Sequence, residues 1–179
     1  MLEIKNVSKS YGRHTALSNL NLNIPDGALF GLVGPNGAGK TTAMKIISDI
    51  IFPDNGDIIF NNINLCREKK ATKEIVGYVP DVLGIYDDMT VFEYMLFFAA
   101  TYGLTGYIAR KKADILLEQV GMTDKKNFYL NELSRGMQQK LCVARALIHN
   151  PELIIMDEPA SGLDPRARYE LKELLQELN

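Results

Sequence analysis

Alternating hydrophobic and polar positions near the start of the chain predict two β-strands, because successive side chains of a strand point to opposite faces. The apolar positions of these strands are Leu2, Ile4, Val7, Leu20, Leu22 and Ile24. Asparagines separate the apolar residues of the second strand, so we expect an antiparallel pair with one exposed face. Pro25-Asp26-Gly27 is expected to end the second strand as a turn.

Short runs of consecutive apolar residues predict strands that are buried on both faces. The runs are residues 29–33, 75–79 and 153–156. Ligands collect at the carboxyl ends of such strands in open α/β sheets. Asp81 follows the second run closely, and Asp157 and Glu158 directly follow the third. These carboxylates are therefore candidates for metal binding and catalysis.

Helical spacing of apolar residues predicts helices in the rest of the chain. Their expected first residues are Lys40, Val91, Ile108, Arg135 and Pro165. We expect the first helix to reach Ile51. The third is expected to bury Ile115, Leu116 and Val120. Residues suited to cap a helix N-terminus precede three of the five helices. These caps are Ser134, Asp164 and Thr90, the last in a capping box with Glu93.

The sequence between the first apolar run and the first helix, Gly-Pro-Asn-Gly-Ala-Gly-Lys-Thr, fits the phosphate-binding pattern G-x-x-x-x-G-K-[ST]. The glycines of this loop are Gly34, Gly37 and Gly39. They lack a Cβ atom, so we expect the loop to adopt left-handed conformations and to approach phosphate oxygens closely. Lys40 is expected to reach the β- and γ-phosphates, and the Thr41 hydroxyl to bind Mg²⁺. A glycine-rich turn with an unrelated lysine is the alternative.

Composition and charge narrow the classes of function. The chain is 46% hydrophobic and 23% charged, with a net charge of −2 and no sustained basic block, so nucleic acid is not the expected partner. Cys66 and Cys142 lie far apart and are expected to be reduced cytosolic thiols. The N-terminus does not resemble a signal peptide, and no stretch is apolar for long enough to span a bilayer.

Together these motifs resemble the nucleotide-binding domain of ABC ATPases over essentially the whole chain. In the family's order they are an aromatic loop at Tyr11, the phosphate loop at 34–42, a loop at Asp81, Leu-Ser-Arg-Gly-Met-Gln-Gln at 133–139, Asp157-Glu158, and Ser-Gly-Leu-Asp at 161–164. The Leu-Ser-x-Gly element separates this family from other phosphate-loop ATPases. Its Arg-Gly-Met variant resembles the bacterial subfamily that energises export-type permeases.

The resemblance implies an α/β fold: a phosphate-loop NTPase (RecA-like) core sheet, an N-terminal antiparallel β subdomain and an inserted α-helical subdomain. Residues 1–82 would form the ATP-binding core with the β subdomain, 83–150 the helical subdomain, and 151–179 the rest of the core. The family's final strand and switch histidine have no counterpart before Asn179. A C-terminally shortened domain with weak or absent ATP hydrolysis is therefore expected.

The resemblance also implies a mechanism, with ATP and Mg²⁺ as cofactors. Two domains pack head to tail, and each ATP lies between the phosphate loop of one chain and Ser134 and Gly136 of the other. The implied catalytic residues are Glu158 as the base for an attacking water, Lys40 and Asp81. The implied metal ligands are Thr41, Asp157 and Asp81. The implied ATP contacts within one chain are Gly34, Pro35, Asn36, Gly37, Ala38, Gly39, Lys40, Thr41, Thr42 and Tyr11.

Two of these assignments carry alternatives. Tyr11 would stack on the adenine, but a loop tyrosine is more often a surface or packing residue. Asp81 stands where the family normally has glutamine. Aspartate is shorter but remains a hard oxygen ligand, so a metal role survives.

The helical subdomain is expected to transmit motion to an integral-membrane permease, with Asp81 and its loop as the joint. This places the chain on the cytoplasmic face of the cell membrane. Two other functions stay open: a soluble ABC-type ATPase acting on nucleic acid or ribosomes, and a hydrolysis-deficient regulatory subunit. Glu158 argues against the second, because a positioned base accelerates a reaction by ~10²–10⁴-fold and an inactive subunit does not need one.

Overall fold

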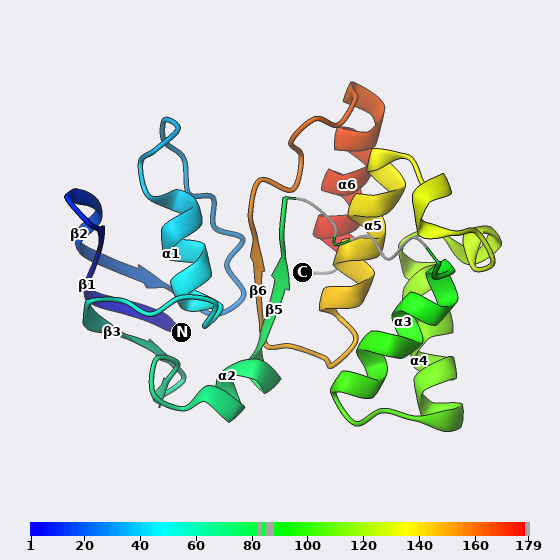
Figure 1. The fold of residues 1–179 in the computed structure, drawn as a ribbon, viewed down its shortest axis with the longest axis horizontal. Helices are drawn as coiled ribbons and strands as arrows, with labels where there is room; N and C mark the ends of the chain where they lie inside the picture. The colour runs from blue at the N-terminus through cyan, green and yellow to red at the C-terminus, as the bar shows by residue number, and fades with distance from the viewer. Residues whose placement is uncertain (82–83, 85–87, 178–179) are drawn as a thin grey trace. The chain divides into compact units, whose positions relative to one another are not determined.

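The computed structural model describes residues 1–81, 84 and 88–177. The chain forms two compact units, Met1–Val76 and Gly77–Asn179 (Figure 1). The loop that follows Asp81, expected to act as a joint, lies largely outside the described residues. None of the described helices has the length and apolar character that crossing a membrane requires.

The first unit is built on a four-stranded antiparallel sheet with the strand order β2-β1-β3-β4. The strands are β1 (Leu2–Tyr11), β2 (His14–Ile24), β3 (Asn55–Phe60) and β4 (Ile63–Asn64). The predicted antiparallel pair is confirmed, with Leu2 opposite Ile24 and Ile4 opposite Leu22. Leu2, Ile4 and Val7 are buried in the unit's core.

Two helices belong to this unit, α1 (Lys40–Ile47) and α2 (Lys69–Ile75). The prediction that the first helix reaches Ile51 is wrong. Asp49 adopts a left-handed φ of 55°, which stops the helix. The Asp49 N–H then donates to the carbonyl of Ile46, and the Ile50 N–H to that of Lys45, at 3.1 and 2.9 Å. This pair of bonds is a Schellman motif with aspartate where glycine is usual, so the sequence carries only a weak stop signal.

The predicted strand at residues 29–33 is also wrong. These residues have no regular secondary structure, and Leu29, Phe30 and Val33 are 71%, 48% and 94% exposed. A strand needs a neighbouring backbone to satisfy its N–H and C=O groups. Among the described residues, the hydrogen-bonded sheet of the first unit contains only the four strands β1, β2, β3 and β4. Hydrophobic composition alone therefore does not make this segment a strand.

The second unit combines a two-stranded sheet with a bundle of helices. The sheet pairs β5 (Val76–Val79), which begins at the last residue of the first unit, with β6 (Leu153–Met156). The Asp157 N–H, just past β6, donates to the carbonyl of Val79 at the end of β5, so both strands end at the same edge. The longer helices are α3 (Val91–Thr101), α4 (Gly106–Gln119), α5 (Arg135–Ala146) and α6 (Pro165–Glu177), and the 3₁₀ turns are η1 (Thr123–Lys125) and η2 (Leu130–Glu132).

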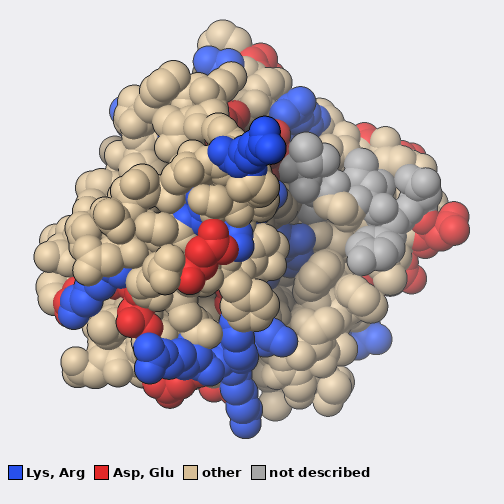
Figure 2. Space-filling model, turned by 60° about the vertical axis from the view of Figure 1, so that its left-hand side comes forward, with Lys and Arg blue, Asp and Glu red and all other residues tan. Residues whose placement is uncertain are grey.

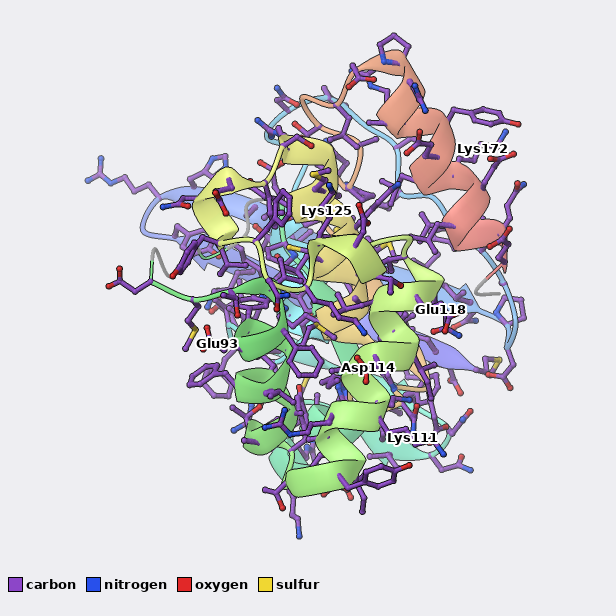
Figure 3. All side chains as sticks on the ribbon, turned by 90° about the vertical axis from the view of Figure 1, so that its right-hand side faces the viewer. Glu93, Lys111, Asp114, Glu118, Lys125 and Lys172 are labelled. Atoms are coloured by element: carbon purple, nitrogen blue, oxygen red, sulfur yellow. The ribbon has the colours of Figure 1, made fainter. Side chains whose placement is uncertain are left out.

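The helices of this unit enclose its hydrophobic core. Tyr94, Leu117 and Leu141, one each from α3, α4 and α5, are fully buried in it. On α4, Leu116 faces the core as predicted and Val120, just after the helix, is buried, whereas the prediction for Ile115 is wrong, since it is 42% exposed. Leu117 is buried instead, so the buried face keeps Leu116 and is centred slightly further along the helix than predicted. Figure 3 shows Lys111, Asp114 and Glu118 along the outer face of α4.

The predicted N-caps are present. The Glu93 N–H donates to the Thr90 hydroxyl, and the Thr90 N–H donates to the Glu93 carboxylate, which completes the capping box. The Ser134 hydroxyl accepts from the Met137 N–H. Asp164 accepts from the N–H groups of residues 166 and 167, with Pro165 as the first residue of α6.

Candidate functional site

The phosphate loop of the first unit bends around the Lys40 side chain. The Lys40 ammonium donates to the carbonyl oxygens of Gly34 and Pro35 at 2.8 and 2.9 Å. Lys40 is also the first residue of α1, and the helix N-terminus carries about half a positive charge. The loop therefore brings a cation to a helix N-terminus, an arrangement that favours binding of phosphate.

Two of the three loop glycines use conformations that only glycine adopts easily. Gly37 and Gly39 have φ values of 84° and 85°. The expectation of a left-handed conformation is wrong for Gly34, which lies outside that region and would place a Cβ atom 3.4 Å from the Cβ of Ala38. Gly39 has a second constraint: its Cβ atom would lie 2.3 Å from the carbonyl oxygen of Ala16 in β2. That packing requirement was not predictable from the loop pattern.

Tyr11 lies at the end of β1, opposite His14 across a tight turn. Its side chain is 51% exposed, and the Lys9 ammonium lies 5.8 Å from the ring centroid. The exposed ring is available for stacking on a base. Its contact with adenine stays a prediction.

The carboxyl edge of the β5–β6 sheet carries the two acids predicted to serve metal binding and catalysis. Asp157 is 5% exposed. The Tyr78 hydroxyl donates to its Oδ2 atom at 3.4 Å. Burial and the neighbouring Asp157 carboxylate raise the pKa of Tyr78 to about 12, so the phenol stays protonated and remains a donor. The Asp157 carboxylate thus lies buried at the sheet edge with the Tyr78 hydroxyl as a donor, and its role as a metal ligand stays a prediction.

Glu158 is exposed and has a φ of 47°, in the left-handed region. A residue other than glycine held there costs ~1–3 kcal/mol, and such residues concentrate at active sites. The Ser161 N–H donates to the Glu158 carbonyl at 2.9 Å, which closes a turn just after the acid. Nothing in the local sequence announces this backbone conformation.

The Leu-Ser-Arg-Gly element forms the start of α5. Ser134 caps the helix and is exposed, so its hydroxyl is accessible. A Cβ atom on Gly136 would lie 3.2 Å from the Cβ of Ala167 in α6. Gly136 thus permits close packing of α5 on α6 within the chain, a reason for glycine that sequence reasoning missed.

Asp81, the third predicted acid, pairs with a residue that was not predicted as part of the site. Its Oδ1 atom lies 3.4 Å from Nη2 of Arg135, the first residue of α5. The second unit therefore holds Asp81, Ser134, Gly136, Asp157 and Glu158, while the first holds Tyr11 and the phosphate loop.

Acidic and basic side chains are intermixed on the face shown in Figure 2. Within each unit, acidic and basic side chains form ion pairs, such as Lys9–Asp54 at 2.8 Å in the first unit and Lys140–Glu170 at 2.7 Å in the second. The Lys9 ammonium and the Ser10 N–H hold the pKa of Asp54 below its ordinary value. Local pairing of this kind matches the small net charge of the chain.

The fold and the phosphate loop define an ATP-binding cassette. A family model described as "ABC transporter" matches residues 17–161. The chain therefore belongs to the ABC transporter family, and the predicted fold class is confirmed.

Curated relatives agree with this assignment. The linearmycin resistance ATP-binding protein LnrL of Bacillus subtilis is 37% identical over 179 residues, and the chain covers 58% of its length. The Nod factor export ATP-binding protein I of Paraburkholderia xenovorans is 38% identical over 177 residues, again with 58% of its length covered. The chain thus spans less than two thirds of the relatives it matches.

Solved structures give the same result for the fold. A dimeric structure of the bacterial ABC transporter cassette MJ0796 matches with a TM-score of 0.88 and 29% identity, covering 99% of this chain and 82% of that one. A second structure of MJ0796, in a post-hydrolysis state bound to ADP and Pi, matches with a TM-score of 0.87, 30% identity and the same coverage.

Proposed function

We propose that this chain is the ATP-binding and hydrolysing part of a membrane ABC transporter. One observation carries the proposal: the Lys40 ammonium sits inside the bend of the phosphate loop, at the start of α1. An anionic phosphate tail that entered the loop would replace the two carbonyl groups as the partner of Lys40, with a stronger, charge-assisted bond.

The proposed roles follow from the chemistry of each side chain. Lys40 binds the β- and γ-phosphates, and the backbone N–H groups of the loop surround them. Glu158 accepts a proton from the attacking water, a step worth ~10²–10⁴-fold in rate. Mg²⁺ is usually held by one or two carboxylates together with phosphate oxygens, and Asp157 and Thr41 supply oxygen donors of that kind. When bound, the metal neutralises charge on the phosphates.

Two chains are proposed to pair head to tail, with Ser134 and Gly136 of each facing the nucleotide of the other. The exposed Ser134 cap supports this role, because a helix N-terminus favours an anion. The dimeric cassettes among the solved relatives support it further. An integral-membrane permease is the proposed partner, on the cytoplasmic face of the cell membrane. The names of the export and resistance proteins among the relatives favour export.

The test measures ATP-dependent thermal stabilisation of the chain in the presence of Mg²⁺. A ligand at about 100 times its Kd stabilises a protein by ~2.7 kcal/mol, which raises the melting temperature of a chain of this size by ~5–11 °C. Lys40→Ala is expected to abolish that increase. Lys45→Ala, a change of the same kind in the same helix, is the matched control and is expected to keep it. Equal stabilisation of both variants by ATP would refute the proposal.

A further inference from the structure

Arg135 contacts two segments of the second unit that are far apart in sequence. The first is the end of the β5 segment, where Nη2 of Arg135 lies 3.4 Å from Oδ1 of Asp81. The two side chains are 52% and 42% exposed, so the ion pair alone is weak. The rest of the guanidinium makes a second contact.

The second contact is with Gly162, in the segment that follows β6. A Cβ atom on Gly162 would lie 2.6 Å from Cζ, 2.8 Å from Nη1 and 2.9 Å from Nε of Arg135. Because three atoms of the planar group are almost equally distant, the guanidinium plane lies over the Gly162 Cα. Gly162 also has a φ of 65°, which favours glycine. Only glycine satisfies both conditions without displacing Arg135.

Only arginine can make both contacts at once. Its guanidinium is planar and carries donors on separate nitrogens, so one edge reaches a carboxylate while the face covers a glycine. A lysine ammonium is compact and has no face to lay on a backbone. The segment under the guanidinium is itself ordered, since the Ser161 N–H bonds to Glu158 and Asp164 caps α6.

We propose that Arg135 is a positioning residue that ties the Asp81 end of β5 and the segment 158–164 to the start of α5. The inference rests on the proposed function. In the head-to-tail dimer, Ser134 acts on the partner's nucleotide, while Asp81 and Glu158 act on the chain's own. Arg135 stands next to Ser134 and contacts the other two segments, so it links the two nucleotide sites of the dimer.

The test uses a Glu158→Gln background, in which loss of the base is expected to preserve an ATP-bound dimer. R135Q, R135K, D81N and the double variant D81N/R135Q are compared, with R110Q on the exposed face of α4 as the matched control. Sedimentation measures ATP-driven dimer formation. Titration with a fluorescent ATP analogue measures binding at the phosphate loop separately.

R135Q and D81N are each expected to weaken dimer formation by about two- to fivefold, the range of an exposed ion pair. The double variant should be no worse than R135Q, because both changes break the same link. R135K should fall between R135Q and the unchanged residue, and R110Q should have no effect. Affinity for the ATP analogue should be unchanged in R135Q, R135K and R110Q. Three results would overturn the proposal: additive effects of D81N and R135Q, dimer formation by R135K equal to that of the unchanged residue, or an effect of R135Q no larger than that of R110Q.

A second measurement separates failure of this inference from failure of the proposed function. Thermal unfolding without nucleotide should show non-additive effects of D81N and R135Q at low salt, and additive ones near 1 M salt, where the Debye length is about 3 Å. Additive effects at low salt would refute the Arg135 link. If no variant, nor the unchanged chain, binds the ATP analogue, the proposed function fails, and the unfolding result still decides the link.

Discussion

Gly39 gives the sharpest test of how the first unit is built, because Gly37 in the same loop is its natural control. Both residues have the same backbone conformation, with φ values of 85° and 84°. An alanine Cβ at position 39 would meet the Ala16 carbonyl oxygen at 2.3 Å and the Leu17 side chain at 2.7 Å. At position 37 it would meet nothing within 4 Å.

The expected costs follow from this difference. Forcing alanine into a left-handed conformation costs ~1–2 kcal/mol at either position. Overpacking adds ~1–3 kcal/mol, and only at position 39, where the backbone oxygen of Ala16 must move. Gly39→Ala should therefore lower the free energy of unfolding by ~1–3 kcal/mol more than Gly37→Ala does.

Urea unfolding without nucleotide, followed by far-ultraviolet circular dichroism, measures both variants. In a thermal melt, the same difference corresponds to a melting temperature ~2–12 °C lower for Gly39→Ala than for Gly37→Ala. Equal destabilisation of the two variants would show that Gly39 does not pack closely against the Ala16 carbonyl of β2.

Two further predictions concern the second unit. Burial raises the pKa of Cys142 to about 11, so between pH ~8.5, the pKa of an unfolded thiol, and pH ~11 the unfolded chain releases a proton that the folded chain keeps. The free energy of unfolding should therefore be at its full value below this window and fall by about 3 kcal/mol across it. Urea unfolding at successive pH values should show a smaller decline in Cys142→Ala. A decline of equal size in that variant would contradict the assignment. Thr90→Ala should lower the free energy of unfolding by ~0.5–2 kcal/mol, because it removes the capping box of α3. Thr105→Ala, at an N-cap with no side-chain hydrogen bond, should have little effect when both variants are compared by thermal unfolding. Similar losses in both would show that the hydrogen bonds of Thr90 do not stabilise the helix.

The features that local chemistry encodes were predictable from the sequence. Thr90, Ser134 and Asp164 satisfy N–H groups only two or three residues away, so their capping roles depend on nothing distant. The bend of the phosphate loop is local in the same sense. The alternation in β1 and β2 marks a buried face, and the pairing of Leu2 with Ile24 follows from it.

The features that were not predictable depend on contacts between residues that are far apart in the sequence. Residues 29–33 are apolar, but a strand is defined by the backbone next to it, and composition does not name that neighbour. One position of the buried face of α4 differs from the prediction, because Ile115 and Leu117 are both apolar and only packing decides which of them is buried. The contact of Arg135 with Gly162 joins residues whose spacing in sequence gives no hint of their approach.

The left-handed backbone at Glu158 has a further consequence. At this position the geometry of the main chain would suit glycine better than glutamate. The stability of the fold and the proposed catalytic role therefore make opposite demands on Glu158. Selection for variants of higher stability would favour glycine at this position, which would remove the carboxylate on which ATP hydrolysis is proposed to depend.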